Sequence, residues 1–193
     1  MSDLSVFYVL DLSESMKGKK LDILNHTVEE CNETLLELAN EKNAELKVAM
    51  MTFSDGCDWI TPHGPEPIED FAFNYFQNTS GLSNLGIALY ELNKNITDIN
   101  FYNISSKDYL PIIIIITDKD NIDNYENILK FVKTNNIYEN SIKIAYTIGN
   151  NHNTELISYI TDNKNSIITN SNENFRKIIK IFGKTTSQNN KEI

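Results

Sequence analysis

The chain has 193 residues, with 17 Lys and Arg against 27 Asp and Glu, which gives a formal net charge of −10 at pH 7. This length is enough for one domain that buries a substantial hydrophobic core. The acidic balance argues against nucleic acid and anionic membranes as partners, because both are polyanions. The two cysteines, Cys31 and Cys57, lack the spacing of a metal site or of a disulfide framework.

The N-terminal residues show no basic segment followed by an apolar one, as a secretion signal would. The longest aliphatic run, residues 112–116, is far too short to span a bilayer. We therefore expect a soluble, cytoplasmic protein that does not bind a membrane.

Apolar runs and helical periodicity alternate along the chain. In chain order they predict a strand at 4–10, a helix at 20–41, a strand at 45–55 with a short hairpin partner at 57–62, a helix at 84–96, a strand at 110–118, a helix at about 123–134, a strand at 142–149, a helix near 154–161, a strand at 166–169 and a helix near 173–182. The segment between the hairpin and the next helix contains Pro62, Gly64, Pro65 and Pro67, which predict an irregular surface loop.

Strands that alternate with helices predict a mainly parallel sheet with right-handed crossovers. Residues 110–118 form the most continuous apolar run, as expected of a central strand that is covered on both faces. The predicted fold class is α/β, a three-layer Rossmann-like arrangement with helices on both faces of the sheet and one antiparallel edge strand. We expect a single domain over residues 1–183, followed by a flexible polar tail at 184–193.

Two of the predicted strands end in an aspartate, Asp11 in FYVLD and Asp118 in IIITD. In a doubly wound sheet, ligands bind beyond the carboxyl ends of the strands, where the strand order reverses. If these two strands are neighbours, both carboxylates face one crevice. Ser13 and Ser15 follow Asp11 closely, and Ser83 precedes a predicted helix, so their hydroxyls can turn to the same point.

This set of side chains offers only hard oxygen donors, without His or Cys. Such donors suit Mg²⁺, Mn²⁺ or Ca²⁺ and argue against Zn²⁺ or copper. The competing explanation for each residue alone is a cap of a helix or turn, where Asp and Ser are common. Caps do not require all of these side chains to face one crevice, so the combination favours a metal site.

DLSES, residues 11–15, resembles the D-x-S-x-S signature of the metal-ion-dependent adhesion site (MIDAS) in von Willebrand factor A (VWA) domains. GLSNLGIAL, residues 81–89, resembles the loop that supplies a Thr in that fold, and IIITD, residues 114–118, resembles its final Asp strand. The resemblance covers about residues 3–183 and is greatest to stand-alone bacterial VWA proteins of the TerY-like, tellurium-resistance type. It implies an Mg²⁺-type ion held directly or through water by Asp11, Ser13, Ser15, Ser83 and Asp118.

Three positions depart from the usual VWA pattern. Ser83 replaces the usual Thr, Glu14 replaces a frequent Gly between the serines, and Lys119 follows Asp118 where Gly is frequent. These changes remove no type of donor, but they alter the charge around the site. A VWA scaffold that binds partners without metal therefore stays open as an alternative.

Two carboxylates and neutral hydroxyls leave Mg²⁺ with at least one open coordination position, which can accept a Glu or Asp carboxylate from another protein. We therefore predict a metal-dependent protein-binding module, and the TerY-like resemblance implies a cytoplasmic stress-response or signalling complex. The other alternative is a metal-dependent phosphohydrolase. Haloacid-dehalogenase-like phosphatases, however, carry a second Asp where this chain has Ser13, and no P-loop or nucleophile elbow is present. We expect no enzymatic activity.

Other reactive or metal-binding residues are predicted to be structural, in the core, in an edge hairpin or on the surface: Cys31, Cys57, His26, His63 and His152. The aromatic segment FAFNYF, residues 71–76, is expected to pack its loop onto the sheet. Repulsion between the carboxylates of the site predicts that Asp118→Ala leaves the stability of the metal-free protein unchanged or raises it.

Overall fold

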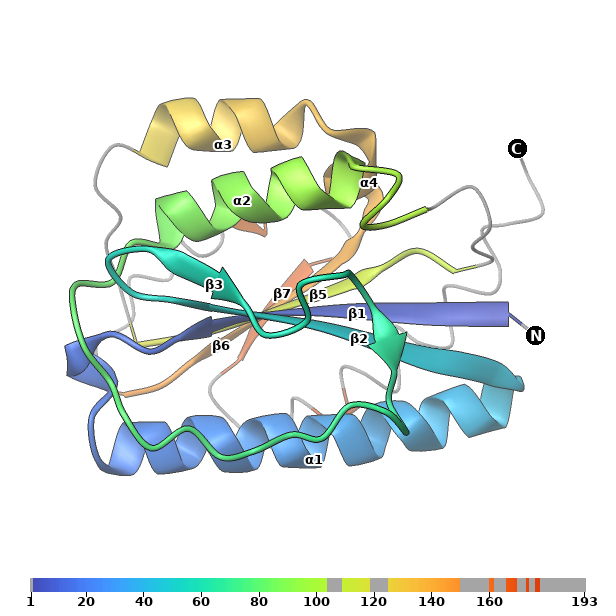
Figure 1. Cartoon of the computed structure of the whole chain (residues 1–193), viewed down its shortest axis with the longest axis horizontal. Helices are drawn as coiled ribbons and strands as arrows, with labels where there is room; N and C mark the ends of the chain where they lie inside the picture. The colour runs from blue at the N-terminus through green and yellow to red at the C-terminus, as the bar shows by residue number, and fades with distance from the viewer. Residues whose placement is uncertain are drawn as a thin grey trace.

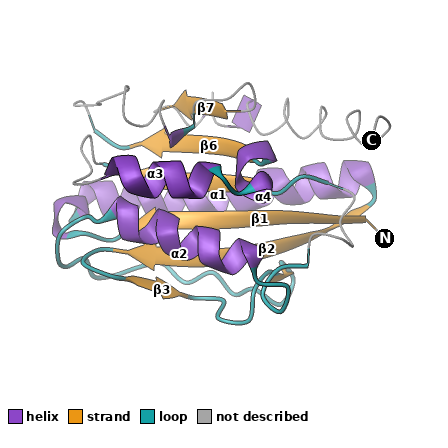
Figure 2. Cartoon of the chain, turned by 90° about the horizontal axis from the view of Figure 1, so that it is seen from above, coloured by secondary structure: helices purple, strands orange, loops and turns teal. Residues whose placement is uncertain are grey.

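A computed structural model gives the structure of the chain, and it describes residues 2–103, 109–118, 125–149, 160–161, 166–169, 173 and 176–177. The predicted tail at 184–193, Lys119, His152 and most of the predicted helices near 154–161 and 173–182 lie outside these residues. The described residues form three layers, with α1 on one face of a central sheet and α2 and α3 on the other (Figures 1 and 2). No helix among them is long and apolar enough to cross a membrane.

The strands are β1 (Ser2–Asp11), β2 (Ala44–Phe53), β3 (Cys57–Trp59), β4 (Glu66–Pro67), β5 (Ile112–Thr117), β6 (Ile142–Thr147) and β7 (Ser166–Thr169). The helices are η1 (Glu14–Met16), α1 (Lys19–Lys42), α2 (Leu85–Thr97), α3 (Tyr125–Lys133) and α4 (Asn136–Asn140). The short α4 was not predicted. It begins where the Asn135 side chain accepts a hydrogen bond from the backbone N–H of Ile137, a cap that is easily missed before so short a helix.

The strand order is β3-β2-β1-β5-β6-β7, and the four pairs from β2 to β7 are parallel. The chain winds outward from β1 to β2 and then returns to β5 on the other side of β1. The strand order therefore reverses between β1 and β5, which meets the condition that the sequence left open for a shared crevice. Because Leu10 pairs with Ile116, Asp11 and Thr117 lie level at the carboxyl ends of these two strands.

The predicted antiparallel edge strand is confirmed as β3, which pairs with β2. The prediction that the proline-rich segment is wholly irregular was wrong. Glu66 and Pro67 form the two-residue strand β4, which also pairs antiparallel with β2. Proline has no backbone N–H to donate. It is tolerated there because one side of an edge strand has no neighbouring strand to bond.

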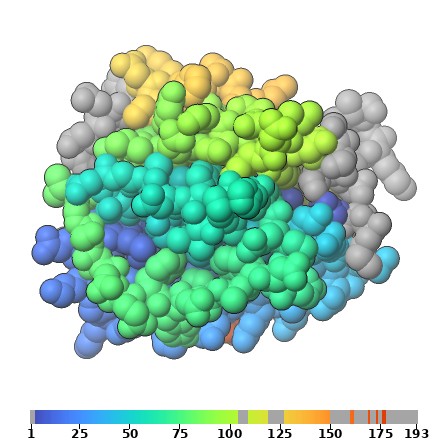
Figure 3. All heavy atoms as spheres, viewed as in Figure 1, coloured from blue at the N-terminus to red at the C-terminus, as the bar shows by residue number. Residues whose placement is uncertain are grey.

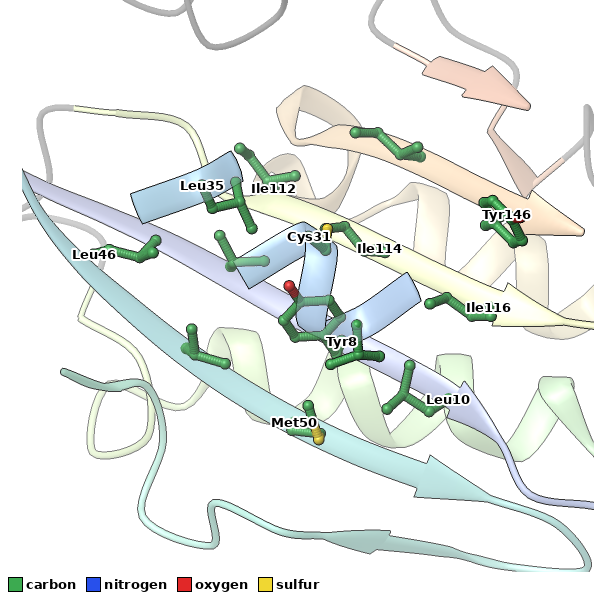
Figure 4. Close-up of a cluster of buried hydrophobic side chains, with 14 of the residues drawn as sticks. Tyr8, Leu10, Cys31, Leu35, Leu46, Met50, Ile112, Ile114, Ile116 and Tyr146 are labelled. Carbon is green, nitrogen blue, oxygen red and sulfur yellow. The ribbon is translucent and has the colours of Figure 1, made fainter. Parts of the chain in front are cut away.

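Both faces of the sheet are buried, which explains the uninterrupted apolar runs. Alternate residues of a strand point to opposite faces. Tyr8, Leu10 and Ile114 pack towards Cys31 and Leu35 of α1 (Figure 4). On the opposite face, residues of β1 and β5 pack beneath α2 and α3: Phe7, Val9, Ile113 and Ile115.

Residues 71–84, here called the connecting segment, link the β2 side of the sheet to α2. The segment runs along α1 and then turns up to the start of α2, covering this side of the molecule (Figures 1 and 3). Phe71 is buried in the core between α1 and the sheet. Asn25 of α1 bonds both the backbone N–H and the carbonyl of Phe76, each at 3.0 Å. The aromatic segment thus packs into this core and along α1 rather than on the sheet alone.

Candidate metal site

The predicted site lies at the carboxyl ends of β1 and β5, at the end of the sheet where α1 and α2 begin (Figure 1). All of its residues are described, and hydrogen bonds link them in two adjoining groups. One group centres on Asp11 and the other on Asp118.

Asp11 is fully buried and accepts three hydrogen bonds. Its Oδ1 accepts from the backbone N–H of Ser13 at 2.9 Å. Its Oδ2 accepts from the Ser83 hydroxyl at 2.8 Å and from the Thr117 hydroxyl at 2.6 Å. Buried polar groups are almost always satisfied in this way, so the carboxylate is held in one orientation.

The second group joins the two serines of the first loop to the end of β5. The hydroxyls of Ser13 and Ser15 lie 3.0 Å apart, and the Ser15 hydroxyl donates to Asp118 Oδ1 at 2.9 Å. Ser13 is buried, and the side chain of Asp118 is only 4% exposed. The sheet and the first loop thus bring together side chains that are more than one hundred residues apart in the chain.

The capping explanation does not account for the two serines whose helices are described. Ser13 precedes η1 without a side-chain capping bond, and α2 is capped by Asn84, whose side chain accepts from the Ile87 N–H. The hydroxyl of Ser83 points to Asp11 instead. Asp118 leads into residues outside the described part, but both of its oxygens have partners among the described residues.

Sequence reasoning missed two residues of the site. Thr117 is the last residue of β5 and read as part of the apolar run, although its hydroxyl bonds Asp11. Lys20, in the first turn of α1, forms an ion pair with Asp118 Oδ2. Three lysines stand between Ser15 and Leu21, and periodicity does not distinguish which of them turns towards the sheet.

The loop that carries Ser83 is held on two sides. The Ser80 N–H donates to the Leu12 carbonyl, and the Gly81 carbonyl accepts from the Glu14 N–H, both at 3.0 Å. On the other side, Asp55 accepts from the Leu82 N–H at 2.7 Å. These bonds fix the backbone around Ser83 relative to both β1 and β2.

Gly81 adopts φ +76°, and a Cβ atom there would lie 2.4 Å from a carboxylate oxygen of Asp55. We expect Gly81→Ala to lower the free energy of unfolding by about 1–2 kcal/mol, because the positive φ strains an L-residue and Asp55 must move. Urea unfolding measures the change. Gly56→Ala is the matched control, since a Cβ atom at Gly56 meets nothing within 4 Å. Equal stability of the two variants would contradict the role given to this turn.

The donor set fits a small hard cation. Its oxygens lie within hydrogen-bond distance of one another: 3.0 Å for Ser13 and Ser15, 2.9 Å for Ser15 and Asp118, and 2.8 Å for Ser83 and Asp11. Carboxylate and hydroxyl oxygens are hard donors of the kind that Mg²⁺ and Ca²⁺ take. Within the described residues, no group of three or more His, Cys, Asp or Glu side chains could hold a metal, so a metal site among them would need other oxygen ligands as well, such as these hydroxyls.

Comparison with known proteins finds solved structures of the same fold. No protein-family model and no curated protein matches the sequence. A von Willebrand factor type A protein from Catenulispora acidiphila superposes with a TM-score of 0.66 at 13% identity, over 96% of this chain and 42% of its own. BatB, a conserved hypothetical protein from Bacteroides thetaiotaomicron, has a TM-score of 0.64 at 14% identity, over 96% and 99%.

A third structure is proximal thread matrix protein 1 of the mussel byssus, in a form with a zinc-occupied MIDAS motif. It has a TM-score of 0.61 at 14% identity, over 96% of this chain and 46% of its own. The fold of this chain is therefore VWA-like, with a mainly parallel sheet and an antiparallel edge. The chain spans less than half the length of the first and third of these proteins, and at such identities the likeness shows the fold alone.

Proposed function

We propose that this chain is a metal-ion-dependent protein-binding module. The observation that carries the proposal is the set of carboxylate and hydroxyl oxygens that hydrogen bonds bring together at the ends of β1 and β5, because such oxygens are the ligands that small hard cations prefer. A zinc-occupied MIDAS motif in a protein of similar fold supports it. Mg²⁺ is the cation that we propose, with Mn²⁺ or Ca²⁺ as substitutes, held by Asp11, Ser13, Ser15, Ser83 and Asp118.

The hydroxyl groups of Ser83 and Ser15 are oriented so that their oxygens can bind a cation. Ser83 donates to Asp11 and Ser15 donates to Asp118. Each O–H therefore points at a carboxylate oxygen, and the lone pairs of the hydroxyl are left for a cation. A bound Mg²⁺ would supply a positive centre with an open position for an external oxygen ligand. Because the chain offers two carboxylates and otherwise neutral donors, a Glu or Asp carboxylate of a partner suits that position.

The rim of the site indicates what else a partner meets. Leu82 is 76% exposed beside Ser83, and its backbone is held by Asp55. Glu14 and Asp55 are also exposed near the first loop and would repel an acidic surface. We therefore propose a partner that presents one acidic side chain next to an apolar one rather than an acidic stretch.

A second candidate is a VWA-like scaffold that binds its partner without metal. The observation that favours it is the ion pair between Lys20 and Asp118, which neutralises one carboxylate of the site without any added cation. On this alternative, the partner recognises the surface around Leu82, and chelators have no effect.

We propose that the chain has no enzymatic activity. Ser13 occupies the position where haloacid-dehalogenase-like phosphatases need an acid, and burial raises the pKa of the Cys31 thiol to about 12, so that thiol is a poor nucleophile. A TerY-like role in a cytoplasmic stress-response complex remains a prediction from the sequence resemblance.

Mn²⁺ tests the proposed function, because water bound to this paramagnetic ion reports an open coordination position. We expect Mn²⁺ with the protein to enhance water proton relaxation, and added acetate to lower it by displacing that water. Ser83→Ala should weaken Mn²⁺ binding by about 10-fold. Ser80→Ala is the control, because Ser80 is exposed in the same loop and contributes a backbone bond that alanine keeps.

A pull-down from cell lysate with and without EDTA then tests the partner. Capture that is lost with EDTA and in Ser83→Ala, but kept in Ser80→Ala, would support the metal-dependent module. Capture that survives both chelation and Ser83→Ala would contradict it and support the scaffold without metal.

A further inference from the structure

We propose that Lys20 is an internal counter-ion that competes with the divalent cation for Asp118 and so sets the affinity of the site. The inference rests on the proposed metal site and deepens it. It names a residue outside the predicted ligand set that controls how readily the site is filled.

The contacts of Asp118 in the structure carry the proposal. Its side chain is 4% exposed, with Oδ1 bonded to the Ser15 hydroxyl and Oδ2 paired with the Lys20 ammonium. Lys20 thus supplies the charge that a buried carboxylate needs when no cation is present. The same carboxylate is one of only two in the proposed ligand set.

The side chain of Lys20 is 39% exposed, so it borders solvent. Its stem lies beside the turn at Gly149, where a Cβ atom would meet Lys20 Cε at 3.9 Å, an ordinary contact. The ammonium can therefore leave Asp118 for solvent without breaking a packed core. In this position Lys20 can compete with a cation for Asp118, but it does not block the site permanently.

A cation bound to Asp118 would lie within a few ångströms of the ammonium, and like charges at that distance repel each other. The cation must either tolerate this repulsion or displace Lys20, and both weaken binding. Removing the ammonium should therefore tighten metal binding, whereas removing an ordinary structural residue would leave it unchanged or weaken it.

Calorimetric titration of metal-free protein with MgCl₂ and with MnCl₂ tests this. We expect Lys20→Met to lower the dissociation constant about 5-fold, which is the upper end of what a partly exposed ion pair contributes. Lys20→Gln, which can still donate a hydrogen bond to Asp118, should also bind more tightly. Lys20→Arg should resemble the natural chain.

Lys19→Met is the matched control. Lys19 is the neighbouring residue of α1, is exposed and carries the same charge, so its loss changes the net charge equally. A general charge effect would shift both variants alike, whereas competition at Asp118 tightens binding only in the Lys20 variants. Equal shifts in Lys19→Met and Lys20→Met would overturn the proposal.

Thermal unfolding supplies a second readout. In EDTA, Lys20→Met should unfold at a lower temperature than the natural chain, because Asp118 is left buried without its counter-ion. Added MgCl₂ should then raise the unfolding temperature more in Lys20→Met than in the natural chain. A variant that folds but binds the cations no more tightly would overturn the role of Lys20, while the proposed function would stand if the natural chain binds them.

The remaining outcomes separate the two proposals. Binding by Lys20→Met with none by the natural chain would support the role of Lys20 and contradict a metal-dependent function. Absence of binding in the natural chain and in every folded Lys20 variant would overturn both.

Discussion

Asp11→Ala is expected to abolish cation binding and to lower the free energy of unfolding by about 2–4 kcal/mol. The carboxylate is fully buried and accepts from the Ser13 N–H and from the hydroxyls of Ser83 and Thr117. Alanine leaves these donors without their acceptor and opens a small cavity. It also removes one of the two charges that would attract the cation. Calorimetry with MgCl₂ and urea unfolding in EDTA measure the two effects.

Asp11→Asn separates binding from folding, because it has the same shape and keeps an acceptor oxygen while it removes the charge. We expect it to lose cation binding as completely as the alanine variant and to lose about 1 kcal/mol of stability. Asp58→Asn on β3 is the control, since Asp58 is exposed and the change in net charge is the same. Cation binding that is unchanged in Asp11→Asn would refute the assignment of Asp11 as a ligand.

Asp118→Asn is expected to weaken cation binding by at least about 100-fold, because a charged ligand is lost. In EDTA we expect the free energy of unfolding to fall by about 1 kcal/mol. This revises the expectation from the sequence, which considered only repulsion between carboxylates. In the structure the Asp118 carboxylate is already paired with Lys20, so removing its charge loses an attraction.

A double-mutant cycle in EDTA checks the sign of this effect. Asp118→Asn and Lys20→Met should each destabilise the metal-free protein. The double variant should be less destabilised than the sum of the two, because no unpaired charge is left. Metal-free Asp118→Asn that is more stable than the natural chain would show that carboxylate repulsion dominates and that the ion pair contributes little.

The layers and the sheet could be predicted because periodicity reports burial directly. The runs that became β1 and β5 are apolar over most of their length, at residues 6–10 and 112–116, as expected of strands covered on both faces. The short elements β4 and α4 were harder to predict. β4 has two residues and contains Pro67, so it leaves no periodic pattern, and α4 depends on a single capping Asn135.

The connecting segment was predicted as a loop, but its course was not. Its aromatic residues signalled packing, whereas the contact with α1 depends on Asn25, which bonds the backbone of Phe76. Every residue type except proline has the backbone N–H and carbonyl that Asn25 bonds, so this contact requires no particular residue at position 76. The sequence of the segment therefore indicated that it packs onto the domain, but not that it lies along α1.

What the sequence by itself determined is the placement of oxygen-bearing side chains: an Asp at the end of each of two largely apolar strands, and serines in the loops beside them. That much follows from local pattern, because strand ends and loops are read from neighbouring residues. Only the tertiary structure decided that β1 and β5 are neighbours, that Thr117 completes the bonding of Asp11, and that Lys20 pairs with Asp118. These contacts join residues about one hundred positions apart, and their energies depend on burial and distance, which are properties of the packed chain.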